Sequence, residues 1–424
     1  MIIHIDFDCF FVSAERTRDK AFCDVPAVVA NRNDAAIFGS NALKTSSKAQ
    51  ESLGAFSGAC YYNKFGDGSW RDYFLEGKSV RGMVVAASYE ARKYNIKTGT
   101  TLSEALKLCP KLRILPTDMP FYMSLSRKTA EFLEARIPVL EQYSIDEFFG
   151  SLHGFIDEDE TLRYLRNLQA EINKEFALPA SIGASVNKSL AKLAAKSVKP
   201  FGVRVVKNNE IKDFIEHKPI RALAGIGRQM GAYLERYGVK TLGDITRAPS
   251  LLDSFGKTGR DLLKELNGET AGQITHKTAR KQMGISRVFD PILDRKEALR
   301  RFLILCGHLA YHITMSKREP RAFTFVVGYR NSPSEHITIR SDRLFSEKTL
   351  YDLAKEAFDA IDKNPNDPIN FLAISGGDFN DKPTSFNMLS WQNDYKNRAI
   401  NEALSKTRAK YGYSAITYSK QTSP

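Results

Sequence analysis

The sequence predicts an α+β fold divided into several domains. Short β-branched runs alternate with helical patterns over the first 207 residues, and one pair of these runs is joined by a tight acidic turn. A helical stretch with tight glycine turns follows, and then a smaller stretch of strands and helices. The 424 residues exceed one small core and suffice for roughly two to four domains.

Periodicity places the strands and helices of the first 207 residues. Strand patterns occupy residues 2–6, 26–30, 83–87, 139–144, 148–152 and 180–186. Helical patterns occupy residues 8–16, 89–94, 103–108, 118–136, 160–176 and 189–198. Residues 35–82 are rich in Ser, Gly, Lys and Asn and weakly periodic, so we expect an inserted, partly irregular segment there.

The second half of the chain changes character twice. From about residue 208, helical patterns with tight glycine turns predict an all-α domain. Residues 271–284 are polar and basic and are typical of a linker. The patterns beyond the linker predict a small β-α-β-β-α-β module, with helices near 295–314 and 347–362 and strands at 324–329 and 337–339. A polar tail follows, with one last helix near residues 395–411.

The net charge of +13 is concentrated late in the chain. Residues 276–348 contain fifteen Lys and Arg against seven Asp and Glu, which accounts for +8 of that total. Positive charge gathered in one segment is typical of a module that binds a polyanion such as nucleic acid.

Several classes of protein are disfavoured by the sequence. The longest apolar runs are too short to cross a bilayer, and no secretory signal precedes the first strand. The five cysteines are scattered without a C-x-x-C pair, so neither a zinc site nor a disulfide framework is expected. We therefore expect a cytoplasmic protein with reduced thiols, associated with the nucleoid when it is on DNA.

Four carboxylates carry the candidate chemistry. Asp6 and Asp8 end the first strand, and the pair Asp146–Glu147 forms the acidic turn. Asp is common in turns, and Asp8 could simply cap a helix. However, a charge at Asp6 between strand residues and a Phe-Phe pair calls for a compensating cation. Two hard divalent ions about 4 Å apart would meet that need and would support an in-line phosphoryl transfer.

Four segments in order resemble the motifs of the Y-family, or lesion-bypass, DNA polymerases of the bacterial type. They are residues 1–11 (MIIHIDFDCFF), 88–94 (SYEARKY), 143–147 (YSIDE) and 191–202 (AKLAAKSVKPFG). The resemblance extends over residues 1–34 and about 83–350. It implies a low-fidelity, DNA-directed DNA polymerase that copies past damaged template bases in translesion synthesis.

The resemblance implies a right-hand architecture. Residues 1–10 and 118–207 would form the palm around an antiparallel sheet. Residues 11–117 would form small fingers with the insertion at about 35–82. The remaining domains would be a helix-hairpin-helix thumb at 208–270, a linker at 271–284, a β-α-β-β-α-β little finger at 285–378 and a C-terminal tail at 379–424.

The resemblance also implies a metal site. Asp6 and Asp146 would bridge two Mg²⁺ ions, which Mn²⁺ can replace. Glu147 and the carbonyl of Phe7 would complete the ligands, whereas direct ligation by Asp8 is less certain for the family. Asp6, Asp146 and Glu147 are thus the expected catalytic residues.

For the incoming nucleotide, the resemblance points to five residues. Phe11 stands at the steric gate, where a rigid ring excludes a 2′-hydroxyl, and Phe10 lies beside it. One of these two rings is expected to start an amphipathic helix into the core. Tyr89 and Arg92 lie three apart at a helix start, so both can reach triphosphate oxygens. Lys199 matches the family's triphosphate lysine, and Lys192 lies two turns earlier on a similar face.

The expected partners are primer–template DNA and dNTPs, with no membrane, and the expected state is a monomer. Gly225 and Gly227 fit a hairpin whose backbone N–H groups approach a DNA phosphate. Arg287 and Arg340 lie in the basic segment that matches the little finger. Residues 387–391 (NMLSW) are the nearest approximation to a sliding-clamp motif, and an ordinary hydrophobic tether is the alternative.

The sequence departs from the family in two places besides the clamp motif. Ala86 replaces a usual hydroxyl residue and Ser88 stands where Asn is frequent, which affects one nucleotide hydrogen bond. The insertion makes its connection about 40 residues longer than usual, and it could alter lesion preference or merely decorate the surface. No exonuclease-like acidic cluster is apparent, so proofreading is not expected.

Three other classes of function compete with this prediction. A DNA-binding protein that had lost its chemistry would not need the intact carboxylate set. A different two-metal enzyme, such as a nuclease or nucleotidyl cyclase, would not call for the hairpin, the basic module and the gate phenylalanine together. A membrane-surface protein would need a basic amphipathic helix with a clean apolar face, which the sequence lacks.

Overall fold

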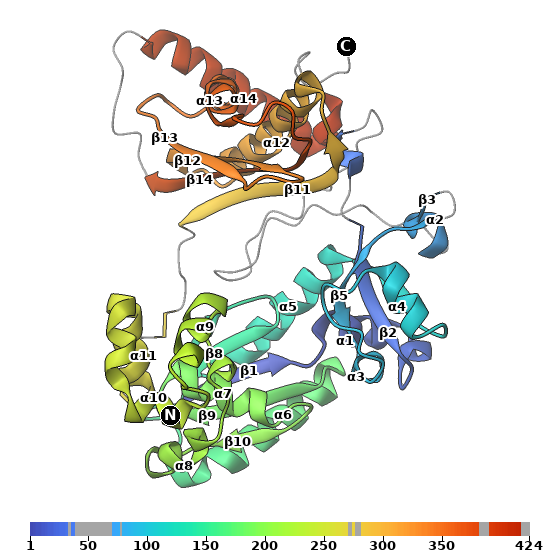
Figure 1. Cartoon of the computed structure of the whole chain (residues 1–424). Coiled ribbons are helices and arrows are strands. Elements are labelled where there is room, and N and C mark those ends of the chain that lie inside the picture. The colour runs from blue at the N-terminus through green and yellow to red at the C-terminus, as the bar shows by residue number, and fades with distance from the viewer. Residues whose placement is uncertain are drawn as a thin grey trace.

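The computed structural model describes residues 1–32, 35–38, 70–76, 79–269, 274–275, 281–380 and 390–416. Within these residues strands and helices are interleaved and the strands form four sheets, which confirms the predicted α+β class. In Figure 1 the elements up to α11, apart from residues 35–38, form the lower part of the molecule, and residues 35–38 lie with the elements from β11 onward in the upper part. Within the described residues, no helix is long and apolar enough to cross a membrane.

A five-stranded sheet in the order β10-β9-β1-β8-β7 forms the first core. The central strand β1 pairs antiparallel with β8 and with β9, and β10 joins β9 in parallel. The strands are β1 (Ile2–Phe7), β7 (Val139–Gln142), β8 (Glu147–Ser151), β9 (Ala180–Ser185) and β10 (Val203–Val205). This sheet is the palm expected from the first and third motifs along the chain.

Three helices pack against the palm sheet: α5 (Met119–Glu134), α6 (Thr161–Phe176) and α7 (Lys188–Ser197). The side chain of Asp118 accepts a hydrogen bond from Phe121 N–H at the start of α5, and Asn187 caps α7 through Leu190 N–H. Helix α7 lies directly on β9 and β1, and its residues Lys188 and Lys192 contact Glu141 of β7 and Glu147 of β8.

The fingers contain a three-stranded sheet in the order β5-β2-β6, with short helices around it. Its elements are α1 (Phe10–Arg18), β2 (Ala27–Asn31), β5 (Met83–Ala87), α3 (Tyr89–Arg92), α4 (Leu102–Leu108) and β6 (Arg113–Pro116). Ser88 is buried and caps α3, since its hydroxyl accepts hydrogen bonds from Ala91 N–H and Ala27 N–H at 3.1 Å each. Ser88 therefore links β2 to the start of α3.

The structure describes several short elements of the expected insertion. They are a 3₁₀ turn η2 (Ala35–Phe38), helix α2 (Trp70–Phe74) and a small hairpin of β3 (Leu75–Glu76) and β4 (Ser79–Val80). Residues 39–69 and 77–78 of this segment lie outside the described residues. Phe38 is only 5% exposed, and it packs into the core of the upper part of the molecule rather than against the fingers.

Residues 208–269 are helical apart from one isolated bridge, as the glycine turns predict. The elements are α8 (Ile211–Glu216), α9 (Arg228–Arg236), α10 (Leu242–Arg247) and α11 (Gly256–Leu266), with 3₁₀ turns η5 (Asn208–Glu210), η6 (Ile220–Ala222) and η7 (Pro249–Phe255). Gly225 adopts φ +99° in the turn before α9, a conformation that favours glycine.

The upper part contains a four-stranded antiparallel sheet in the order β11-β14-β12-β13. Its elements follow the predicted β-α-β-β-α-β order: β11 (Gln282–Ile292), α12 (Arg295–Met315), β12 (Glu319–Tyr329), β13 (Glu335–Arg340), α13 (Glu347–Ile361) and β14 (Ile369–Asn380). Strand β11 begins inside the segment expected to be a linker, and β14 continues two residues into the expected tail.

The helix expected in the tail is α14 (Trp391–Tyr411), and it packs on α12 and α13. Arg408 and Glu347 form an ion pair at 2.6 Å with both side chains at 0% exposure. Arg343 pairs with Asp394 at 2.7 Å near the start of α14. The helix is therefore part of this domain.

Candidate active site

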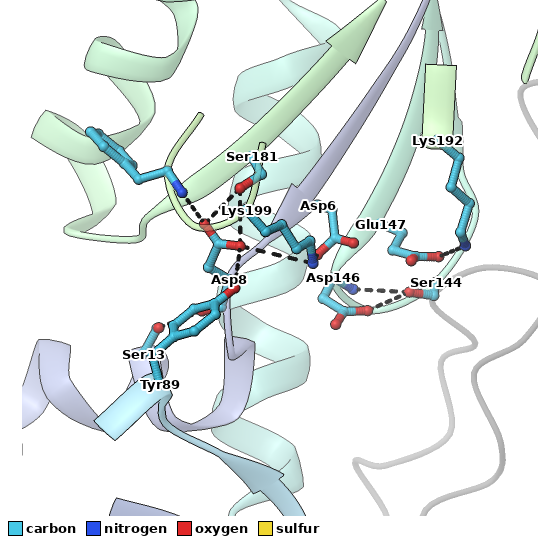
Figure 2. Close-up of polar contacts among 11 residues, drawn as sticks. Asp6, Asp8, Ser13, Tyr89, Ser144, Asp146, Glu147, Ser181, Lys192 and Lys199 are labelled. Atoms are coloured by element: carbon cyan, nitrogen blue, oxygen red, sulfur yellow. Dashed lines mark hydrogen bonds and ion pairs between the residues drawn. The ribbon is translucent and has the colours of Figure 1, made fainter. Parts of the chain in front are cut away.

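The three expected catalytic carboxylates come together at one end of the palm sheet. Asp6 near the end of β1 lies directly opposite Glu147 at the start of β8, and Asp146 precedes Glu147 in the turn after β7. The N–H of Phe7 donates to the carbonyl of Asp146 at 3.0 Å, which ties the turn to the central strand. Antiparallel pairing thus unites acids that are far apart in the sequence (Figure 2).

Lysines contact two of these carboxylates. Lys199 Nζ donates to Asp6 Oδ1, and Lys192 Nζ lies 2.7 Å from Glu147 Oε2. Asp146 accepts a hydrogen bond from the hydroxyl of Ser144 at 2.5 Å instead. In the part of the chain that the structure describes, no three His, Cys, Asp or Glu side chains are grouped as a metal site. The partners of these three acids are thus two lysine ammonium groups and one serine hydroxyl.

Burial raises the pKa of two of these acids. The pKa of Asp6 rises to about 7, chiefly through burial, although the Lys199 ammonium opposes the rise and the charges of Glu147 and Asp146 add to it. The pKa of Asp146 is also raised by burial, against the hydrogen bond from Ser144. Buried carboxylates that repel one another favour a cation between them. Carboxylate oxygens are the kind of ligand that hard divalent ions bind. Within the described residues, however, Asp6 and Glu147 are paired with ammonium groups, and the three acids are not grouped around one metal position.

Asp8 differs from the other acids because it is 1% exposed and its carboxylate is surrounded by donors. Ser181 Oγ donates to both oxygens, at 3.0 and 2.9 Å, and the N–H of Phe201 donates at 2.8 Å. The hydroxyl of Tyr89 donates at 3.2 Å. Asp8 does not cap the following helix either, since Cys9 stands at the cap position without a side-chain hydrogen bond.

The two expected triphosphate ligands of the fingers lie side by side on α3. Arg92 Cζ is 4.7 Å from the centroid of the Tyr89 ring, and its Nε donates to the carbonyl of Ala87 at 3.1 Å. Burial, followed by the charge of Asp8, raises the pKa of Tyr89, so its hydroxyl stays protonated. A phenol and a guanidinium thus lie at the edge of the carboxylate site.

The two phenylalanines of the first motif lie in different environments, and one of them enters the core as expected. Phe10 is 3% exposed and belongs to the palm core, where its ring lies 5.8 Å from that of Phe7. Phe11 is half-buried and stacks on Tyr122 of α5, with 4.5 Å between ring centroids. Phe11 therefore remains the candidate gate, and Phe10 is a core residue.

The expected DNA contacts lie away from the carboxylates. Gly225 and Gly227 form the turn before α9, and an added Cβ at Gly227 would meet no atom within 4 Å. Arg287 lies on β11 and Arg340 on β13, at the two edges of the upper sheet. The side chain of Arg340 is 76% exposed and contacts Asp378 at 2.9 Å. Of the expected clamp motif, residues 387–389 lie outside the described residues.

Sequence reasoning missed the residues that support the site. Ser181 and Tyr122 are ordinary core positions by their patterns, and nothing local connects them to Asp8 or Phe11. Ser144 lies within the third motif along the chain, so its place two residues before Asp146 was a usable signal. Lys192, which stayed uncertain, proves to contact Glu147.

A palm sheet with convergent carboxylates, small fingers, a helical domain and a further β-α-β-β-α-β domain together define a right-hand polymerase. Residues 68–196 match the impB/mucB/samB family, and residues 280–388 match the C-terminal domain of that family. The chain belongs to this family, the Y-family of DNA polymerases, which confirms the resemblance of the motifs.

Individual relatives agree with this assignment. The chain is 26% identical to DNA polymerase IV of Clostridium kluyveri, over 98% of this chain and 96% of that protein. It is 28% identical to DNA polymerase IV 1 of Bacillus subtilis, over 80% of this chain and 84% of that protein. Among solved structures, the Y-family DNA polymerase chimera Dbh-Dpo4(243-245)-Dbh has the same fold, with a TM-score of 0.70 at 19% identity over 89% of this chain and 98% of the chimera.

Proposed function

We propose that this protein is a DNA-directed DNA polymerase that adds dNTPs to a primer 3′ end with low fidelity and synthesises past damaged template bases. The observation that carries the proposal is the pairing of Asp6 with Glu147 across β1 and β8, beside Asp146. The relatives named DNA polymerase IV support the same activity. The protein would act as a monomer on DNA in the cytoplasm.

Asp6, Asp146, Glu147 and the Phe7 carbonyl would hold two Mg²⁺ ions, with Mn²⁺ able to replace them. When bound, such ions activate the primer hydroxyl and neutralise the charge that develops on the transferred phosphoryl group. Binding would exchange the contact of Glu147 with Lys192 and that of Asp6 with Lys199 for contacts with the ions. The released Lys199 ammonium would then be available to a triphosphate oxygen.

The remaining side chains bind and select the nucleotide. Arg92 would present its guanidinium to the triphosphate as a hydrogen-bond donor, and Tyr89, whose hydroxyl proton is donated to Asp8, would hold its ring beside that guanidinium. Phe11 presents its ring to the sugar, so that a 2′-hydroxyl would collide with it. The turn at Gly225 and Gly227 and the basic strands with Arg287 and Arg340 would contact DNA phosphates without reading sequence.

Low fidelity and lesion bypass would follow from the small fingers, whose sheet has three strands. A small fingers domain encloses the templating base less tightly and so tolerates a distorted one. A sliding clamp could be a further partner through residues 387–391, with Trp391 at the start of α14 half-exposed at 47%.

Primer extension tests the proposal. The full chain is incubated with a primed template, dNTPs and Mg²⁺, on an undamaged template and on one that carries an abasic site. The test variant combines Asp146→Ala with Glu147→Ala. The matched control combines Asp157→Ala with Glu158→Ala, since these adjacent acids are exposed and lie outside the carboxylate site.

We expect extension by the native protein and the control, bypass of the abasic site, and loss of extension in the test variant with DNA binding kept. If the native protein binds primer–template but adds no nucleotide, the catalytic proposal fails and a DNA-binding role replaces it. If the native protein extends but stops at the lesion, the polymerase stands and the bypass proposal fails.

A further inference from the structure

The side chain of Asp8 contacts three separate segments of the palm and fingers. It directly follows the central palm strand β1, and its carboxylate contacts Tyr89 from the fingers, Ser181 from β9 and Phe201 from the loop after α7. Its own backbone is held as well, since its N–H donates to the carbonyl of Pro179 at 2.8 Å and its carbonyl accepts from Ser13 Oγ at 2.6 Å. Figure 2 shows the side chains of Tyr89 and Ser181 meeting at the Asp8 carboxylate.

Three donor groups of the protein occupy both oxygens of this carboxylate. A carboxylate offers about four lone-pair directions. The hydroxyl of Tyr89 donates to Oδ1 and the N–H of Phe201 donates to Oδ2, while the single hydroxyl proton of Ser181 is shared between the two oxygens. With 1% of its surface exposed, Asp8 also has almost no access to the solvent side of the site. Asp8 therefore uses its carboxylate to hold other residues of the protein. The neighbouring acids are more accessible to solvent than Asp8.

Two of the groups that Asp8 holds belong to the proposed triphosphate site. Tyr89 is one of them. The other is the loop of Lys199, because Phe201 lies two residues further on and Lys199 Nζ is 3.8 Å from Asp8 Oδ1. Phe201 adopts φ +52°, an unfavourable conformation for a residue other than glycine, so this loop needs a tertiary contact to keep its shape. The hydrogen bond from its N–H to Asp8 supplies one.

We propose that Asp8 is a positioning residue for the incoming nucleotide and not a metal ligand. It fixes the Tyr89 hydroxyl and the Lys199 loop relative to each other, across the junction of fingers and palm. The inference rests on the proposed polymerase function. It predicts that substitution of Asp8 changes the affinity for the nucleotide. Substitution of Asp6, two residues earlier, should instead change metal binding and the chemical step.

The test compares Asp8→Asn and Ser181→Ala with Ser185→Ala as the matched control. Ser185 lies on the same strand as Ser181 and is equally buried, but its hydroxyl donates to the carbonyl of Val206 at 3.0 Å. Single-nucleotide incorporation gives KM for dNTP, kcat and the half-saturating Mg²⁺ concentration. Equilibrium binding of dNTP to the complex with a dideoxy-terminated primer gives affinity without chemistry, and a thermal melt checks folding.

We expect Asp8→Asn to raise KM and the dNTP dissociation constant about tenfold, since loss of a hydrogen bond to a charged group costs a factor of that order. The value of kcat and the Mg²⁺ midpoint should stay within about twofold of native, because Asp8 holds no metal. Ser181→Ala should move dNTP affinity in the same direction by a smaller factor, and Ser185→Ala should leave it unchanged.

Other outcomes would overturn the inference. A raised Mg²⁺ midpoint with lost kcat in Asp8→Asn would identify Asp8 as a metal ligand. Native dNTP affinity in both Asp8→Asn and Ser181→Ala would remove the positioning role. If Asp8→Asn fails to fold, Ser181→Ala alone decides. If the native protein does not extend primers at all, the proposed function fails, while the dNTP-binding comparison still decides the role of Asp8.

Discussion

The ring of Phe11 lies parallel to the ring of Tyr122, with 4.5 Å between centroids and 16° between planes. The hydroxyl of Tyr122 donates to Glu15 Oε1 at 2.6 Å, and both residues are buried. Glu15 follows Phe11 by one turn of α1, so the helix that carries the gate also anchors the ring behind it. The proposed gate at Phe11 is thus backed by Tyr122 of α5, whose hydroxyl is held by Glu15.

Removing this backing should weaken sugar selection. We expect Tyr122→Leu to lower the preference for dNTP over rNTP by about two- to tenfold, the range of one aromatic pair. Tyr122→Phe keeps the ring and should retain more of the preference. The measurement is the ratio of kcat/KM for matched dNTP and rNTP. An unchanged ratio in Tyr122→Leu, with Phe11→Leu still losing selectivity, would contradict the role of Tyr122.

Metal binding should depend on Lys192, which lies 2.7 Å from Glu147 in the palm. In Lys192→Met, Glu147 loses its ammonium partner, so Mg²⁺ no longer has to displace it. The rise in Tm on adding Mg²⁺ to metal-free protein should exceed the native rise by about 1–3 °C. Lys196→Met is the control, because Lys196 is exposed and contacts the carbonyl of Ala222 at 3.3 Å. Equal Mg²⁺ shifts in the two variants would argue against this exchange.

Phe38 connects the insertion to the upper domain. Its ring lies 5.6 Å from that of Phe289, its carbonyl accepts from Arg300 at 2.9 Å, and Arg301 lies 5.1 Å over its ring. We expect Phe38→Ala to release this contact and to raise amide hydrogen exchange in β11 around Phe289. Phe155→Ala is the control, since Phe155 is 49% exposed in the palm. Native exchange in β11 of the Phe38 variant would mean that the contact does not hold the two parts together.

The buried pair of Arg408 and Glu347 should dominate the attachment of α14. Both side chains are at 0% exposure, and the hydroxyl of Tyr351 also donates to Glu347. Arg408→Met leaves an unpaired buried carboxylate and should lower the free energy of unfolding of this domain by about 3–5 kcal/mol. The exposed Arg163, paired with Glu160, is the control, and Arg163→Met should cost less than about 1 kcal/mol. Denaturant titration followed by circular dichroism measures both, and equal losses would refute the distinction.

Arg340 should contribute to DNA affinity without sequence preference. It is exposed on β13 at one edge of the upper sheet. If it neutralises one phosphate, Arg340→Ala should reduce the slope of log K against log salt concentration by about 1. Fluorescence anisotropy of labelled primer–template over a salt series gives this slope, with Arg163→Met again as the control. A slope equal to the native one would mean that Arg340 stays paired with Asp378.

The sequence by itself determined the class, the motifs and the order of the elements. Local periodicity located the central strand Ile2–Phe7 and the later β-α-β-β-α-β module, because hydrophobic patterning reflects which face of an element is buried. Asp6 stood out because a charge between strand residues and a Phe-Phe pair needs compensation, and the pair Asp146–Glu147 stood out because residues 143–147 resemble a family motif. These features depend on residues near one another in the chain, so a single sequence carries them.

Only the tertiary structure decided which side chains meet. Pairing of β1 with β8 places Asp6 opposite Glu147, whereas a one-residue slip would turn one of them to the other face. The donors around Asp8 come from β9, the fingers and a palm loop, and the ring behind Phe11 comes from α5. Phe38 reaches a core more than 240 positions further along the chain, as its hydrogen bond to Arg300 spans 262 residues. Such contacts depend on how elements pack in space, and no local pattern of residues encodes that packing.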